Sequence, residues 1–136
     1  MFIAIVGGLL VLYLYAIKPG KPARKKIEPF LGRYYAHRGL FDNNADTPEN
    51  SLKAIIKAVQ NGYGVEFDVR LTQDNIPVVV HDNKLRRVSG VDGLVTEMAF
   101  KELQVIRLFE SQEEVPTLRQ VLDIVGGKVP AIVELK

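Results

Sequence analysis

The sequence contains no cysteine. Disulfide bonds and thiolate metal sites are therefore excluded, and any bound metal must be held by oxygen or imidazole ligands. Histidine is also scarce, with 2 in 136 residues. The chain shows neither an internal repeat nor a low-complexity segment. Its length suits one domain with a hydrophobic core but is short for two, so we expect one principal fold.

The basic residues are unevenly distributed along the chain. The chain has 18 Lys and Arg residues against 16 Asp and Glu residues, a net charge of +2. Five of the basic residues lie within residues 18–26, and the rest of the chain is net acidic. A nucleic-acid binder usually carries a basic face with aromatic residues interleaved. Nucleic acid is therefore not an expected partner, and residues 18–32 are interpreted as a basic linker.

Residues 1–17 carry no charge. As a helix they would be about 26 Å long, slightly short of a hydrocarbon core about 30 Å thick. A cleaved signal peptide would need basic residues before the apolar run and small residues after it, and both are missing. A transmembrane anchor at 1–17 is therefore predicted, with a buried core helix as the alternative. The cations that follow predict a single-pass membrane protein whose domain is cytoplasmic and whose linker lies near anionic lipid.

Strand-like and helix-like segments alternate beyond residue 32. Strands are expected at 33–37, 64–71, 76–82 and 131–136, and helices at 48–60 (after Thr47 as N-cap), 96–106 and 117–125. The valine run at 78–80 is typical of a strand buried on both faces in a parallel sheet. The alternation predicts an α/β fold with mostly parallel strands. It fits either the N-terminal portion of a (β/α)₈ TIM-type barrel or a doubly wound sheet.

Carboxylates recur two residues apart on the predicted strands. Side chains at this spacing share one face of a strand, so Glu66 and Asp68 point the same way. Glu134 and Lys136 repeat the spacing on the last strand. Unpaired carboxylates among buried strands would cost several kcal/mol each. The pattern predicts one hard cation, Mg²⁺ or Ca²⁺, held by the three carboxylates, with Lys136 facing a substrate anion.

His37 and His81 each end a predicted strand. Catalytic side chains gather at the C-terminal ends of strands in α/β folds. Imidazole titrates near neutral pH, so one ring can accept a proton while the other donates one. A single histidine at such a position is more often structural, and a carboxylate pair is more often solvated. Their coincidence favours a catalytic site.

Five stretches then resemble a known family in order and spacing: AHRG, PENS at a predicted helix start, EFDVRLTQDNIPVVVHD, PTL and VELK. They resemble the signature of the glycerophosphodiester phosphodiesterases, from about Arg33 to Lys136. Ser51 stands where Thr is commoner. The resemblance implies a (β/α)₈ barrel and metal-dependent hydrolysis of glycerophosphodiesters to glycerol 3-phosphate and an alcohol. The expected substrate is a glycerophosphodiester or a lysophospholipid-like molecule.

The resemblance also implies a role for each residue that matches a motif. His37 and His81 would be the general acid and base, and Glu49 and Asn50 would brace the first loop. The substrate phosphate would be bound by Arg38 and Lys136, and the metal by Glu66, Asp68 and Glu134. Water and the substrate's own 2-hydroxyl both remain candidates for the nucleophile.

A barrel of this type needs about 250 residues. The sequence is therefore expected to be a fragment or a truncated product, with residues 33–136 as a partial phosphodiesterase domain. A catalytically inactive membrane-anchored protein that binds lipid headgroups or a partner is one alternative, and an unrelated α/β hydrolase is another. The presence of both histidines and three carboxylates favours the enzyme.

Overall fold

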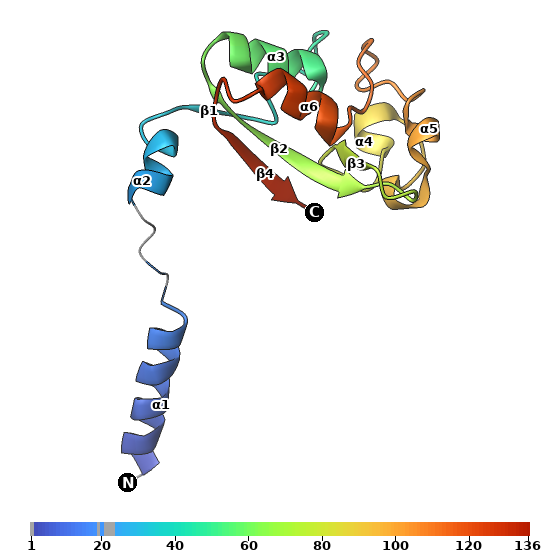
Figure 1. Cartoon of the computed structure of the whole chain (residues 1–136). Coiled ribbons are helices and arrows are strands. Elements are labelled where there is room, and N and C mark those ends of the chain that lie inside the picture. Colours follow the sequence, from blue (N-terminus) through green and yellow to red (C-terminus); the bar gives the residue numbers. More distant parts are fainter. Residues whose placement is uncertain (1, 19, 21–23) are drawn as a thin grey trace. The chain divides into compact units, whose positions relative to one another are not determined.

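The computed structural model describes residues 2–18, 20 and 24–136. It divides into two compact units, Met1–Leu31 and Gly32–Lys136, each described here by itself (Figure 1). The parts of the predicted anchor and linker at residues 1, 19 and 21–23 lie outside the described residues.

The described residues of the first unit form three short helical segments. These are α1 (Phe2–Ala16), α2 (Arg24–Ile27) and the 3₁₀ helix η1 (Glu28–Phe30). With 15 residues, α1 is about 22 Å long at about 1.5 Å per residue, well short of a hydrocarbon core of about 30 Å. Among the described residues, no helix is long and apolar enough to cross a membrane. The structure therefore does not support the transmembrane anchor predicted at 1–17.

The second unit is built on a four-stranded sheet centred on β2 (Gly64–Leu71). β2 runs parallel to β1 (Tyr35–His37) and to β4 (Ala131–Leu135), and antiparallel to β3 (Pro77–Val79). Glu66 pairs with residues of both β1 and β4, so these strands lie on opposite edges of β2. The predicted α/β class with parallel strands is confirmed.

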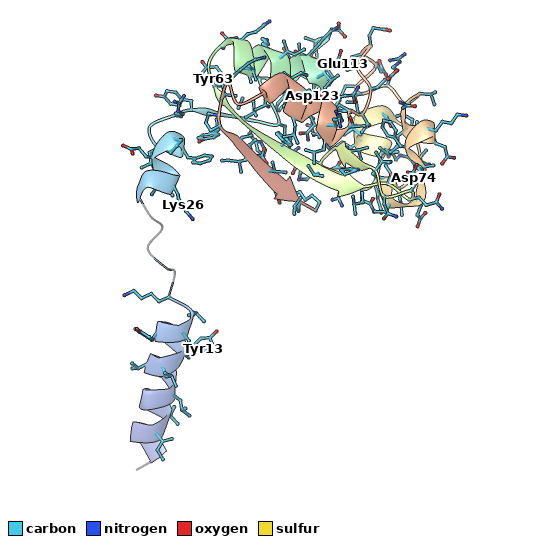
Figure 2. The ribbon with its side chains drawn as sticks, in the orientation of Figure 1. Tyr13, Lys26, Tyr63, Asp74, Glu113 and Asp123 are labelled. Carbon is cyan, nitrogen blue, oxygen red and sulfur yellow. The ribbon has the colours of Figure 1, made fainter. Side chains whose placement is uncertain are left out.

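The strand predicted at 76–82 was wrong in length and in direction. β3 covers only Pro77–Val79 and is antiparallel to β2. The antiparallel direction follows from the tight connection before β3, where the hydroxyl of Thr72 accepts a hydrogen bond from Ile76 N at 2.9 Å. Asp74 (Figure 2) ties this turn down by accepting from the Thr72 hydroxyl at 2.5 Å and from Phe100 N at 3.0 Å. A parallel crossover would need a dozen or more residues.

Helices α3 (Leu52–Gln60) and α6 (Leu118–Val125) lie side by side on one face of the sheet (Figure 1). Helix α6 begins after Thr117, as predicted. The Thr117 hydroxyl accepts from Gln120 N at 3.2 Å in a capping box. The α3 start is later than predicted. Ser51, not Thr47, is the N-cap, and its hydroxyl accepts from Ala54 N at 3.2 Å.

The helix predicted at 96–106 is broken into a 3₁₀ turn, η2 (Val95–Glu97), and the single-turn α5 (Phe100–Leu103), because Met98 and Ala99 between them are extended. With α4 (Arg86–Ser89), these turns cover a second apolar cluster beside β3.

The main core lies between the sheet and the two long helices. Phe67 and Val69 of β2 pack there with Ile55 of α3 and with Val121 and Val125 of α6. Since successive side chains on a strand point to opposite faces, the side chains between these core positions point away from the helices. The residues at those alternate positions of β2 are Glu66 and Asp68.

Candidate metal and phosphodiester site

Three carboxylates, here called the carboxylate triad, meet on the face of the sheet opposite the helices. Glu66 and Asp68 come from β2 and Glu134 from β4, where it is the direct register partner of Asp68. One carboxylate oxygen from each residue lies within 4.8 Å of the other two. The sequence prediction that these three side chains share one place on the sheet is confirmed.

The charge of the carboxylate triad is only partly balanced by the protein. Asp68 is fully buried, and its Oδ1 accepts no hydrogen bond from the part of the chain that the structure describes. Lys136 Nζ lies 3.4 Å from that oxygen and donates to Glu134 Oε1 at 2.5 Å. The hydrogen bond to Glu134, and secondarily contact with Asp68, raises the pKa of Lys136 against the effect of desolvation. A buried carboxylate oxygen without a hydrogen bond, in an all-oxygen cluster, fits a hard divalent cation.

Arg38 and Asn50 lie beside Asp68. Asn50 Nδ2 donates to Asp68 Oδ2 at 3.1 Å, and the backbone N–H of Arg38 donates to Glu66 Oε2 at 3.1 Å. Arg38 Nε lies 3.5 Å from Asp68 Oδ2. Both residues have positive φ, 60° and 59°, a conformation that costs side-chain-bearing residues energy. A backbone hydrogen bond of 2.9 Å from Asn50 N to Arg38 O joins the two loops in this arrangement.

Glu49 accepts hydrogen bonds from several side chains around Arg38. Its carboxylate accepts from Arg38 Nη1 at 2.9 Å, from Asn43 Nδ2 at 3.1 Å, and from Arg87 Nη2 and Nη1 at 2.7 and 3.1 Å. Burial alone would raise the pKa of Glu49, but the hydrogen bonds from Arg87 and Asn43, with the charges of both arginines, outweigh it and lower the pKa. These contacts agree with the predicted bracing role of Glu49.

The two histidines lie in different surroundings. His37 ends β1 as predicted, and its Nε2 lies 3.8 Å from Glu66 Oε2 with 68% of the side chain exposed. His81 lies beyond the end of β3, not on it, because β3 stops at Val79. Its Nδ1 lies 2.6 Å from Asp82 Oδ1. Only His37 of the two is in ion-pair distance of the carboxylate triad.

Residues 37–136 match the model of the "Glycerophosphoryl diester phosphodiesterase family". The chain belongs to this family. It is 31% identical to glycerophosphodiester phosphodiesterase 1 of Rattus norvegicus, with 83% of this chain and 37% of the relative covered. It is 34% identical to a glycerophosphodiester phosphodiesterase of Caldanaerobacter subterraneus, with 68% and 40% covered.

Solved structures of phosphodiesterases share the fold. A phosphodiesterase of Oleispira antarctica, solved in complex with the product sn-glycerol-3-phosphate, gives a TM-score of 0.70 at 33% identity, with 80% of this chain and 46% of that chain covered. The glycerophosphodiester phosphodiesterase of Thermotoga maritima gives 0.64 at 35% identity, with 76% and 43% covered. The chain therefore spans less than half the length of these phosphodiesterases.

Sequence reasoning missed Asp82, Arg87 and Asn43 in this candidate site. Arg87 Nε donates to Asp82 Oδ2 at 2.6 Å, and Asn43 both donates to Glu49 and accepts from its backbone N–H. The position of Asp82 directly after His81 was the one available signal. Nothing in the sequence distinguishes Arg87 from its neighbour Arg86, which pairs with Asp92 at the surface.

Asp82 should make the stability of the domain at residues 32–136 depend on pH in the acid range. The hydrogen bond from Arg87, and secondarily that from His81, lowers the pKa of Asp82 from 3.8 to about 2 against desolvation. A depressed folded-state pKa gives stability that is present above pH 4 and is lost as the pH falls toward 2. The Arg87 side chain is 45% exposed, and solvent therefore screens the ion pair. We expect it to contribute about 1 kcal/mol to the free energy of unfolding.

The measurement is urea unfolding of the wild type and of Asp82→Asn at pH 6 and near pH 2. The variant should be less stable by about 1 kcal/mol at pH 6, and the difference should shrink near pH 2. A difference that is equal at both pH values would contradict the ion-pair origin.

Proposed function

We propose that the chain carries part of the active site of a glycerophosphodiester phosphodiesterase with a (β/α)₈ barrel, which uses a divalent cation to release glycerol 3-phosphate and an alcohol. The observation that carries the proposal is the carboxylate triad with the hydrogen-bond-free Oδ1 of buried Asp68. Family membership and the product named for the Oleispira antarctica structure support the substrate class. The inactive binding protein is less favoured, because every proposed site residue is present.

The carboxylates of Glu66, Asp68 and Glu134 would hold the cation, Mg²⁺ or Ca²⁺. Such a cation supplies stabilisation of the negative charge that develops on the phosphate oxygens. The protein prepares its place by fixing Asp68 through Asn50 and Glu66 through the backbone of Arg38.

Two cationic side chains are placed to bind the substrate phosphate. The backbone N–H of Lys136 donates to Val69 O at 3.1 Å, which fixes the residue at the end of β4. Its ammonium group has three donors, so it can bind a phosphate oxygen while it contacts Glu134. Arg38 is held through Nη1 by Glu49, and guanidinium has further N–H groups for an oxyanion.

The histidines would move the protons of the reaction. One imidazole accepts the proton of the attacking hydroxyl, from water or from the 2-hydroxyl of the substrate, and the other protonates the departing alkoxide. His37 stands next to Glu66 of the triad. His81 has its Nδ1 occupied by Asp82, so its Nε2 is the nitrogen left for the substrate.

The closure of the barrel is also part of the proposal. β4 is paired with β2 on one edge, and its Ile132, Val133 and Leu135 are exposed by 45%, 41% and 79%. Open strand edges with exposed apolar side chains call for a covering element. Further strands after β4 would cover these side chains and shield the carboxylate triad from water.

Hydrolysis of glycerophosphocholine is the direct test. The longest protein that carries this sequence should release glycerol 3-phosphate and choline with Mg²⁺ or Ca²⁺ and should stop when EDTA removes the metal. Residues 1–136 alone should be weakly active or inactive, because β4 is uncovered. Absence of hydrolysis with either metal would contradict the proposed function, and equal turnover by the short chain would contradict the need for a closed barrel.

A further inference from the structure

An unbroken chain of contacts joins His81 to the buried Glu49. His81 Nδ1 lies 2.6 Å from Asp82 Oδ1, Asp82 Oδ2 accepts from Arg87 Nε at 2.6 Å, and both terminal nitrogens of Arg87 donate to Glu49. Arg87 links Asp82 to Glu49. The proposed function uses His81 but assigns no part to Arg87.

Each of the three guanidinium nitrogens of Arg87 donates a hydrogen bond. Glu49, whose side chain is 5% exposed, accepts two hydrogen bonds from it, at 2.7 and 3.1 Å. This fork fixes the plane of the group. With the plane fixed, Nε can donate in only one direction, and Asp82 Oδ2 is the acceptor in that direction. Phe109 packs against the guanidinium with its ring centroid 5.7 Å from Cζ, which adds a cation–π contact.

The position of Asp82 in turn decides the state of the His81 ring. A carboxylate oxygen at Nδ1 accepts the proton of that nitrogen, so the neutral ring carries its hydrogen on Nδ1. Nε2 then has a free lone pair, and after protonation it becomes the donor. In both states the reactive nitrogen is Nε2, and the ring cannot turn without losing its bond to Asp82.

We propose that Arg87 is a positioning residue, which acts through Asp82 to hold the His81 ring with Nε2 toward the substrate and which is itself aligned by Glu49. This inference rests on the proposed function of His81 as a proton-transfer group. The contacts of Arg87 are with Glu49, Asp82 and Phe109, not with the carboxylate triad. No contact with the reacting phosphate is assigned to it.

The first test is kinetic and uses the longest protein that carries this sequence. Arg87→Ala should lower kcat for glycerophosphocholine by about 10- to 100-fold, the usual scale for partners that orient a functional group, with KM changed little. Arg87→Lys should restore only part of the rate, because an ammonium group cannot form the fork and the Nε contact together. Arg86→Ala is the matched control, and it should keep the wild-type rate, because its side chain is 75% exposed and pairs with Asp92.

The test that separates positioning from general damage is the same substitution without His81. In a His81→Ala background, Arg87→Ala should cause little further loss, because the group through which it acts is gone. An equal loss in both backgrounds would overturn the proposal. Thermal unfolding of each variant shows whether the domain remains folded.

The second test needs no turnover. ¹⁵N spectra of the His81 ring should show the Nδ1–H tautomer in the wild type and in Arg86→Ala, and a smaller share of it in Arg87→Ala. Unchanged ring shifts in Arg87→Ala would overturn the proposal. If the wild type hydrolyses no glycerophosphodiester, the proposed function fails, and these spectra alone decide whether Arg87 sets the tautomer.

Discussion

Replacing Asp68 with asparagine should abolish metal-dependent hydrolysis and lower the affinity for Mg²⁺ or Ca²⁺ by at least about 100-fold. Residues that only orient a metal ligand typically cost about 10- to 100-fold in affinity, and Asp68 is proposed as a direct ligand. It is also the most deeply buried member of the carboxylate triad, with one oxygen that accepts no hydrogen bond from the described residues. Asparagine has nearly the same shape, and its carbonyl oxygen can still accept from Asn50.

Stability offers a readout of the same site that is independent of activity. A ligand present at about 100 times its dissociation constant stabilises the folded state by about 2.7 kcal/mol. Wild-type protein should therefore melt at a higher temperature with saturating metal than with EDTA, and Asp68→Asn should lose this difference. Asp123→Asn is the control, because Asp123 (Figure 2) is exposed on α6, the helix that packs on the other face of the sheet. Calorimetry that finds equal metal affinity in Asp68→Asn and wild type would refute the ligand assignment.

The carboxylate triad could be predicted because it depends on local geometry. Alternation along 64–71 places Phe67 and Val69 in the core, which leaves Glu66 and Asp68 on the other face whatever the rest of the fold does. The parallel register then needs only one further fact, that β4 lies next to β2. The family resemblance implied a (β/α)₈ barrel, and the structure shows the pairing of Asp68 with Glu134.

The contacts of His81 could not be predicted because they depend on distant groups and on turns. The valine run suggested a parallel strand ending at the histidine, but the turn between Thr72 and Ile76 reverses the chain, and β3 stops at Val79, two residues before the histidine. Arg87 meets Glu49 across 38 positions of sequence. No periodicity or propensity marks which of two adjacent arginines makes that contact.

The structure does not support the anchor prediction, and the reason is quantitative. Hydropathy along 1–17 is that of a membrane span, and the difference between prediction and structure lies in helix length, since α1 stops at Ala16. The calculated length of the uncharged run was already below the thickness of a hydrocarbon core.

Replacing either His37 or His81 with alanine should lower the rate of glycerophosphodiester hydrolysis by about 10²–10⁴-fold, the usual contribution of a general acid or base. Metal affinity should change little, because neither imidazole belongs to the carboxylate triad; His37 Nε2 lies 3.8 Å from Glu66 Oε2 and His81 is bonded to Asp82. The double variant should be scarcely slower than the slower single variant, because groups that act as a unit have non-additive effects.

Added imidazole distinguishes a lost proton carrier from a damaged fold. The His37 side chain is 68% exposed and that of His81 is 32% exposed, so the space left in His37→Ala is more open to a small molecule. Imidazole should therefore restore part of the rate in His37→Ala and less in His81→Ala, with no effect on the wild type. Full activity in either single variant would refute its catalytic assignment. Losses that multiply in the double variant would show instead that the two rings contribute independently to the same transition state.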